Sequence, residues 1–195
     1  MISYIGPVST IVDNPTIAIA RRLRAEREAR GWTIADLAEL SGVSKAMISK
    51  IERTEASPTA MLLGRLSGAF GLTLSRLLAG AEDAGQRLAR FADQPVWRDP
   101  ETGYVRRAVS PPSGGPLELV SIEIPVGARV AYPASAFTFI HQQIWVTSGA
   151  LVFHEGEVEH QLCAGDCLQL GQPVECSFAN PGPERCTYLV AIVRR

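Results

Sequence analysis

Lys45 and Lys50 are the only lysines of the chain, and they lie five residues apart. On a helix they would share one exposed face with Ala46 and Ser49, whose small side chains would lie between the two cations. No acidic residue lies near the start of this segment. A helix of this kind suits the major groove of DNA, where the first residues of a recognition helix read base edges. We therefore expect Lys45, Ala46, Ser49 and Lys50 to face bases.

Three further side chains flank this face and could hold the DNA backbone. Thr33 and Ser44 are expected at the starts of two consecutive helices, and Arg53 at the end of the second. Backbone N–H groups at helix starts and a guanidinium both suit phosphate oxygens. We expect Thr33, Ser44 and Arg53 to contact phosphates, with Arg21 or Arg22 as additional candidates. The alternative is an ordinary helical hairpin whose charged face is only solvated.

These side chains can act together only if two short helices cross through a tight turn. Small Ala38 stands where the helices would approach, and Gly42 can adopt the left-handed conformation that the turn needs. The apolar seam beneath both helices would consist of Leu37, Val43, Ile48 and Ile51. The spacing thus predicts a helix-turn-helix unit.

The helical pattern extends on both sides of this unit. Apolar spacing with regular breaks predicts five helices, at 16–30, 34–41, 45–53, 59–70 and 74–79. Capping residues precede four of them: Thr33, Ser44, Ser57 or Thr59, and Thr73.

Residues 17–78 resemble the XRE, or phage-repressor, class of helix-turn-helix domain. The resemblance is carried by Leu23–Glu28, Trp32-Thr33, Ser44, Ile48–Arg53, Ser57–Thr59 and Phe70–Leu74. It implies a five-helix bundle that binds operator DNA, usually as a dimer. Two positions depart from the family: Ile34 replaces a common Gln, and Thr54 replaces a Gly that often follows the helix.

From Val96 onward the pattern changes to short β-rich runs separated by turn signals. Strands are expected at Leu117–Ile124, Phe137–Thr147, Gly149–His154, Val158–Leu162 and Arg185–Val193. About eight to ten strands at this spacing predict a closed sandwich or barrel. The chain is therefore expected to be a multidomain α + β protein: a flexible arm (1–15), a five-helix DNA-binding domain (16–80), a linker (81–95) that could extend a helix, and an all-β domain (96–195).

The all-β part resembles a cupin, a double-stranded β-helix barrel that is common behind XRE domains. Gly149, Gly165-Asp166 and Asn180-Pro181-Gly182 carry the resemblance. The family's metal-ligand positions correspond here to Ala136, Thr138, Gln142 and Cys176, which form a poor ligand set for first-row metals. His141 would point to the other face of its strand. The resemblance thus implies no metal and no cofactor, and an effector pocket at Thr138, Gln142, Trp145 and Cys176, with Tyr132 as a further companion.

All four cysteines, Cys163, Cys167, Cys176 and Cys186, lie in the last 33 residues. Free cysteines often serve as small apolar core residues. The alternatives are a thiol pair that senses oxidants or a soft-metal site, although no Cys-x-x-Cys spacing supports structural zinc.

Charge and hydropathy narrow the function further. The net charge of −1 divides into +3 for residues 1–80 and −4 for residues 81–195, as expected for a nucleic-acid module joined to another domain. No apolar run could span a membrane, and the first residues do not resemble a signal peptide, so the expected location is the cytoplasm. The sequence predicts a DNA-binding transcriptional regulator, a homodimeric repressor whose barrel binds a small-molecule effector. A metal-dependent cupin enzyme that carries a DNA-binding domain is the alternative, and a barrel that only dimerises is a third.

Overall fold

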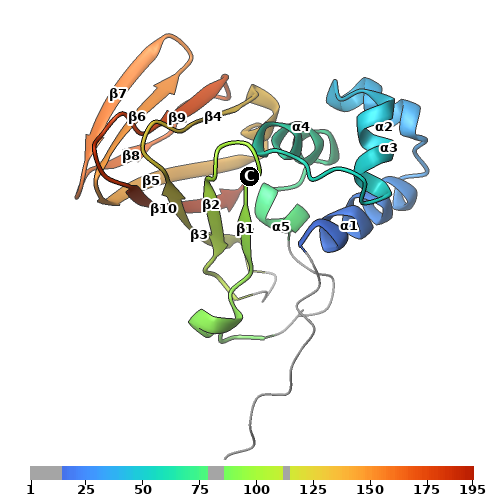
Figure 1. Cartoon of the computed structure of the whole chain (residues 1–195), viewed down its shortest axis with the longest axis horizontal. Helices are drawn as coiled ribbons and strands as arrows, with labels where there is room; N and C mark the ends of the chain where they lie inside the picture. Colours follow the sequence, from blue (N-terminus) through green and yellow to red (C-terminus); the bar gives the residue numbers. More distant parts are fainter. Residues whose placement is uncertain (1–14, 79–85, 112–114) are drawn as a thin grey trace, which may run out of the picture.

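The computed structural model describes residues 15–78, 86–111 and 115–195. The helices gather on one side of the molecule and the strands on the other (Figure 1). Apart from Pro15, the expected N-terminal arm lies outside the described residues, as do residues 79–85 of the expected connection.

Five α-helices form the first part of the chain, close to the predicted bounds: α1 (Pro15–Ala29), α2 (Ile34–Ser41), α3 (Lys45–Glu52), α4 (Ala60–Phe70) and α5 (Leu74–Leu78). Local signals fix their ends. The hydroxyls of Thr33, Ser44 and Thr59 accept hydrogen bonds from the backbone N–H three residues ahead. Gly42 and Gly71 end α2 and α4 in the left-handed conformation. Of the two candidate caps for α4, the structure uses Thr59.

The helices surround one apolar core. Its fully buried side chains come from every helix: Leu23, Leu37, Ile48, Ile51, Leu63, Leu66 and Leu77. Trp32, which precedes α2, stacks on Phe70 at the end of α4 with ring centroids 5.7 Å apart. One face each of α2 and α3 therefore packs against the core of the bundle, and the opposite face of each helix is exposed.

Ten strands follow in the described residues, as the sequence predicted: β1 (Val96–Arg98), β2 (Val105–Ala108), β3 (Leu117–Ile124), β4 (Arg129–Tyr132), β5 (Ile140–Ser148), β6 (Ala150–Glu155), β7 (Val158–Cys163), β8 (Cys167–Gln169), β9 (Cys176–Ala179) and β10 (Cys186–Arg194). They form a six-stranded sheet in the order β1-β2-β3-β10-β5-β8 and a four-stranded sheet in the order β4-β9-β6-β7. From β3 to β10, consecutive strands that enter the barrel belong to opposite sheets, apart from the β6–β7 hairpin. This is the double-stranded β-helix expected from the cupin resemblance.

The connection between helices and barrel differs from the expected helical extension. Residues 86–90 have no regular secondary structure, and one 3₁₀ turn, Phe91–Asp93, precedes β1. The guanidinium of Arg107 lies over the Phe91 ring, 4.2 Å from its centroid. At this point the chain contacts the barrel and does not continue as a helix.

Helix α4 contacts the barrel directly, against β4 and the 3₁₀ turn Ala134–Ala136 (Figure 1). Two glycines permit this approach. A β-carbon on Gly64 would come within 2.7 Å of the Tyr132 ring, and one on Gly68 within 2.9 Å of the Ser135 carbonyl oxygen. Because both distances are shorter than a side chain tolerates, only glycine allows α4 to lie this close to the barrel.

Candidate nucleic-acid interface and barrel cavity

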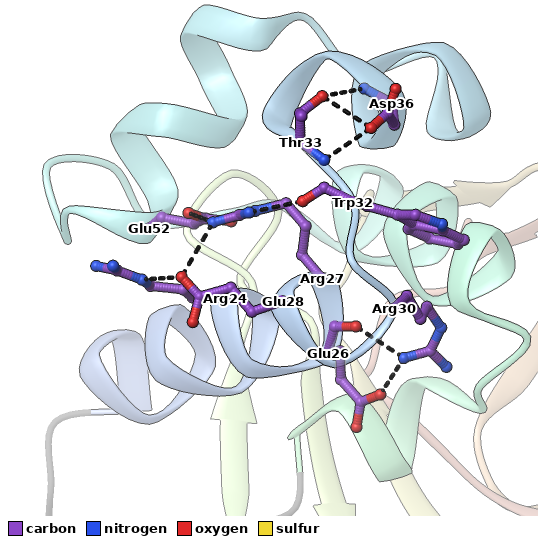
Figure 2. Close-up of polar contacts among 9 residues, drawn as sticks. All are labelled: Arg24, Glu26, Arg27, Glu28, Arg30, Trp32, Thr33, Asp36 and Glu52. Atoms are coloured by element: carbon purple, nitrogen blue, oxygen red, sulfur yellow. Dashed lines mark hydrogen bonds and ion pairs between the residues drawn. The ribbon is translucent and has the colours of Figure 1, made fainter.

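Side-chain caps and one glycine fix the start of α2 and the turn from α2 to α3, and Thr33, Gly42 and Ser44 were expected from the sequence. Thr33 and Asp36 form a capping box, in which the Thr33 hydroxyl accepts from the Asp36 N–H and the Asp36 carboxylate accepts from the Thr33 N–H at 2.7 Å (Figure 2). The hydrogen bonds that the Asp36 carboxylate accepts from the Thr33 N–H and the Thr33 hydroxyl lower the pKa of Asp36 below its usual value. Gly42 closes the helix with φ 66°, and Ser44 caps the next.

Helix α3 presents one exposed face and one buried face. Ile48 and Ile51 are fully buried against the bundle. The expected base-facing residues Lys45, Ala46 and Lys50 are exposed, and Ser49 is half-buried. Thr33, Ser44 and Arg53 are exposed as well. The structure thus brings all seven expected DNA-contacting residues to α3, its two ends and the start of α2.

Two of these residues contact each other. Nη1 of Arg53 donates a hydrogen bond to the Ser49 hydroxyl at 2.8 Å, and Nε donates to the Glu55 carboxylate at 2.7 Å. Exposed pairs of this type contribute little to stability because water competes for both partners. A further hydrogen bond from Nη2 of Arg53 to the second Glu55 oxygen, at 2.9 Å, makes this surface pair bidentate.

A buried ion pair that the sequence reading missed fixes the position of α3. Arg27 on α1 donates two hydrogen bonds to the Glu52 carboxylate, at 2.7 and 2.9 Å, and a third to the Trp32 carbonyl oxygen at 2.9 Å (Figure 2). The side chains of Arg27 and Glu52 are only 11% and 6% exposed. One guanidinium thus joins α1, the loop before α2 and the end of α3. Both residues occur in the motif stretches 23–28 and 48–53, but their pairing across 25 positions leaves no local signal.

The two departures from the family pattern have different structural outcomes. Ile34, at the first position of α2, is half-buried and packs against the helical core. Thr54 adopts a left-handed conformation with φ 61°, and it is the only non-glycine residue among those described with positive φ. The N–H of Glu55 then bonds to the Lys50 carbonyl oxygen. Thr54 therefore keeps the turn that Gly usually makes, with backbone strain.

The expected effector residues separate into two groups. Gln142 is buried and lines a cavity of about 480 Å³, a volume that includes space open to solvent. It also lines a second cavity of about 270 Å³ together with Cys176, which is buried too. Thr138 precedes β5 and is exposed, while Trp145 lies on the outer face of β5 and is 48% exposed. The strict alternation of β5 turns Gln142 inward and Trp145 outward, so the structure does not bring these residues together.

The positions that hold the metal in the cupin family do not fit a metal here. Thr138 donates to the Ala134 carbonyl oxygen, and the Cys176 thiol contacts the Val174 carbonyl oxygen. Burial, together with the charges of Glu155 and Glu175, raises the pKa of Cys176 to about 12, which disfavours the thiolate that binds metals. No cluster of three or more His, Cys, Asp or Glu side chains suited to a metal occurs in the ranges that the structure covers. His141 is exposed, as its strand position predicted.

The four cysteines also divide by burial. Cys163 and Cys167 are exposed free thiols, whereas Cys176 and Cys186 are buried free thiols. Burial raises the pKa of Cys186 to about 11. Because the thiolate is the reactive form, the two buried thiols are poor oxidant sensors.

The larger cavity is lined by several polar side chains, and two of them, Arg106 and Tyr104, were not among the residues predicted from the sequence. Tyr132, which was expected as a companion residue, lines the cavity together with Arg106 and Tyr104. Arg106 is only 8% exposed. Helix residues line the same cavity, among them Ser67, Thr73 and Leu74. The cavity thus lies between the barrel and helices α4 and α5.

Comparison with known proteins supports the helical region most specifically. The family model for the helix-turn-helix domain HTH_3 matches residues 23–77. The HTH-type transcriptional regulator SutR of Escherichia coli (strain K12) is 34% identical over 73 residues, which cover 37% of this chain and 41% of SutR. The uncharacterized HTH-type transcriptional regulator Mb0023 of Mycobacterium bovis is 37% identical over 76 residues, 37% of this chain and 30% of Mb0023. The chain thus spans less than half the length of these two relatives.

One solved structure resembles nearly the whole chain. It is an HTH_3 family transcriptional regulator from Vibrio cholerae, with a TM-score of 0.74 and 22% sequence identity over 91% of this chain and 96% of that one. The likeness extends through the helices and the barrel alike. The two proteins therefore share a fold.

Proposed function

The chain carries an XRE-type helix-turn-helix domain of the HTH_3 family followed by a cupin-type barrel, and from this premise we propose that it is a sequence-specific DNA-binding repressor. The observation that carries the proposal is the exposed face of α3, with Lys45, Ala46 and Lys50 outward above buried Ile48 and Ile51. The capped turn at Gly42 and the Arg27–Glu52 ion pair hold this face in place. A rigid helix with an exposed basic face is what major-groove reading requires.

Within this proposal the seven residues have two roles. Lys45, Ala46, Ser49 and Lys50 read base edges, and Thr33, Ser44 and Arg53 hold phosphates. Base contacts determine which sequence is preferred, whereas phosphate contacts strengthen binding to every sequence.

The test is selection of binding sites from fragmented genomic DNA with the full chain, followed by titration of the selected duplex. Lys45→Ala and Ser49→Ala should change the sequence preference. Arg53→Ala should weaken binding to all sequences. It should also reduce the slope of log affinity against log salt concentration by about one. Arg185→Ala is the matched control, because it removes one positive charge from an exposed barrel loop and should leave DNA binding unchanged. If each of the three single variants, Lys45→Ala, Ser49→Ala and Lys50→Ala, binds the operator normally, the assignment of this α3 face to the bases is refuted.

We further propose that the protein acts in the cytoplasm as a homodimer. One recognition helix reads few base pairs, and a two-fold pair reads two half-sites about one DNA turn apart. The outer face of the six-stranded sheet offers a surface for the second copy. Leu117, Trp145 and Val193 are 50%, 48% and 39% exposed on it, and Val193 pairs directly with Leu117 across β10 and β3. No helix in the described part of the chain is long and apolar enough to cross a membrane.

Sedimentation of the wild-type chain and of Trp145→Arg tests the dimer. A charged residue on this apolar face should shift the protein from dimer to monomer at micromolar concentration. Val158→Arg, at a similarly exposed position on β7 (54% exposed), is the control and should remain dimeric. A wild-type chain that is monomeric both free and on DNA would contradict the dimer.

The barrel supplies the effector site in this proposal. Gln142 and Cys176 are the expected pocket residues that face its interior cavities. Extraction of the purified protein followed by mass spectrometry of the released small molecules would identify a retained effector, and its addition should change the affinity for the selected DNA.

A further inference from the structure

The larger cavity, whose volume of about 480 Å³ includes space open to solvent, receives walls from both parts of the chain. The barrel contributes residues of β2, β4, β5, β9 and β10, and the helical part contributes Gly64 and Ser67 of α4 with Thr73 and Leu74 at the start of α5. A molecule inside it would therefore touch the DNA-binding domain and the barrel at once. Few positions in the fold allow such a double contact.

Arg106 places a positive charge in this cavity that the protein does not neutralise. Its side chain lies among the least exposed charged residues, and one hydrogen bond is formed, from Nη2 to the Ser75 hydroxyl at 2.8 Å. Within the described ranges its guanidinium has no ion-pair partner. A guanidinium has five N–H donors, so most of them remain available.

The two nearby carboxylates are engaged elsewhere. Glu118 accepts a hydrogen bond from the Thr73 hydroxyl at 2.7 Å and pairs with Arg76 at 3.5 Å. Asp99 is buried and accepts from the Thr102 hydroxyl and the Glu101 N–H. Glu118 is thus balanced by Arg76, and Asp99 is held by its own turn. In the part of the chain that the structure describes, neither carboxylate forms an ion pair with Arg106.

A second polar group in the cavity also has no partner. The Tyr132 hydroxyl is completely buried and forms no hydrogen bond of ordinary length with any described residue, and its polar neighbour is the Tyr104 phenol. Burial raises the pKa of Tyr132 well above its usual value, so the phenol keeps its proton and can donate. A buried donor without an acceptor is costly, and a ligand oxygen would supply the acceptor.

Much of the remaining wall is apolar, beside the polar side chains of Gln142, Ser67 and Thr73. Phe137, Ile140, Phe178, Val190 and Ile192 surround the two polar groups. Ligand sites commonly combine such walls with a few converging polar groups. The lining therefore suits a molecule with one anionic end and an apolar body.

We propose that this cavity binds a small organic carboxylate, whose charged end is held by Arg106 and the Tyr132 hydroxyl, and that binding draws Arg106 away from Ser75 of α5. The proposal rests on the proposed function, because it identifies the effector's chemical class. It also gives a physical route from ligand to DNA-binding domain. The Arg106–Ser75 hydrogen bond joins the barrel to α5. A carboxylate that pairs with the planar guanidinium through two parallel hydrogen bonds fixes its orientation, and it therefore competes with Ser75 for that orientation.

The first experiment measures binding of acetate, butyrate and benzoate to the full chain by calorimetry, each against its uncharged amide. At least one acid should bind 10-fold or more tightly than its amide, which corresponds to about 1.4 kcal/mol. Arg106→Gln should abolish that preference. Arg107→Gln is the matched control, since Arg107 is the next residue of β2 and contacts Phe91 instead. No preference for any acid over its amide would overturn the proposal, as would an unchanged preference in folded Arg106→Gln.

Tyr132→Phe and Ser75→Ala provide independent tests. Tyr132→Phe removes only the hydroxyl and should weaken carboxylate binding. Ser75→Ala removes the competitor for Arg106 and should tighten binding about two- to tenfold, the usual value of one hydrogen bond. Ser121→Ala, on the outer face of β3, is the control. Unchanged or weaker binding in Ser75→Ala would refute the proposal that the ligand draws Arg106 away from Ser75 of α5.

The DNA titration separates failure of this inference from failure of the proposed function. A chain that binds its selected DNA but shows no acid preference retains the DNA-binding function and lacks the anion site. A chain that prefers the acid but binds no DNA retains the site and refutes the function.

Discussion

Two buried arginines, one in each part of the molecule, differ in what neutralises them. Arg27, in the helical bundle, has its countercharge within the chain, because Glu52 accepts two of its hydrogen bonds and the Trp32 carbonyl oxygen a third. Arg106, at the cavity, has one hydroxyl partner. Both side chains are almost inaccessible to water, yet only the first is satisfied.

The difference indicates two uses of a buried charge. A guanidinium with a complete set of internal acceptors fixes elements relative to one another, and its free energy depends on keeping all of them. A guanidinium without a carboxylate retains capacity for an external anion. The helical region is thus built to hold one arrangement, and the cavity region is built to accept a partner.

The largest effect is expected at the satisfied pair. Glu52→Ala leaves Arg27 buried without a countercharge and should lower the free energy of unfolding by roughly 3–5 kcal/mol, measured by urea denaturation. Glu55→Ala is the control, because Glu55 pairs with Arg53 on the surface and its loss should cost at most about 1 kcal/mol. Equal losses in both variants would remove the distinction between the buried pair and a surface pair.

A smaller effect is expected where the two regions meet. Gly68→Ala forces a β-carbon to within 2.9 Å of the Ser135 carbonyl oxygen, and overpacking of this kind costs about 1–3 kcal/mol. The better helix propensity of alanine returns about 1 kcal/mol, so the variant should be less stable overall. Met61→Ala, on the exposed side of α4, should change stability little. A Gly68→Ala variant more stable than the wild type would show that α4 does not depend on close approach to the barrel.

The turn after α3 should respond in the opposite direction. Thr54→Gly relieves a left-handed conformation at φ 61° and should raise stability by up to about 1 kcal/mol, since glycine also makes the unfolded chain more flexible. Thr54→Ala keeps the β-carbon and should bring no gain. Thermal unfolding of the two variants isolates the backbone contribution, and equal melting temperatures would argue against strain at this residue.

The smallest effect is expected at the unsatisfied arginine. Arg106→Met loses one hydrogen bond to Ser75 but also removes a buried charge, so the free energy of unfolding should stay within about 1 kcal/mol of wild type. Arg27→Met is the direct comparison and should cost several times more. If both replacements destabilise the protein equally, Arg106 is also structural and the contrast between the two arginines fails.

The sequence predicted the helical part closely because its signals are local. Hydroxyl caps at Thr33, Ser44 and Thr59 and the glycines Gly42 and Gly71 mark helix ends within a few residues of each boundary. The exposed positions of α3 follow from helical periodicity alone. Alternation along β5 likewise predicts that Gln142 faces inward and His141 outward.

The same alternation exposes the limit of the pocket prediction. Trp145 is three residues from Gln142 on β5, so it must face the other way, and Thr138 lies before the strand begins. Family position suggested these residues as companions, whereas strand geometry separates them. The connection after residue 86 also differs from the expected helix, because Arg107 holds Phe91 against the barrel.

The sequence by itself determined where the five helices begin and end, to within a residue or two, and which face of α3 is exposed, because neighbouring residues encode capping and periodicity. The strand bounds followed less closely, since the strand expected from Phe137 begins at Ile140. Only the tertiary structure decided which charges meet. Arg27 finds Glu52 across 25 positions and Arg106 finds Ser75 across 31, and Gly64 on α4 makes room for the Tyr132 ring. Countercharge and burial depend on distances in space between residues distant in sequence, and the chain acquires those distances only on folding.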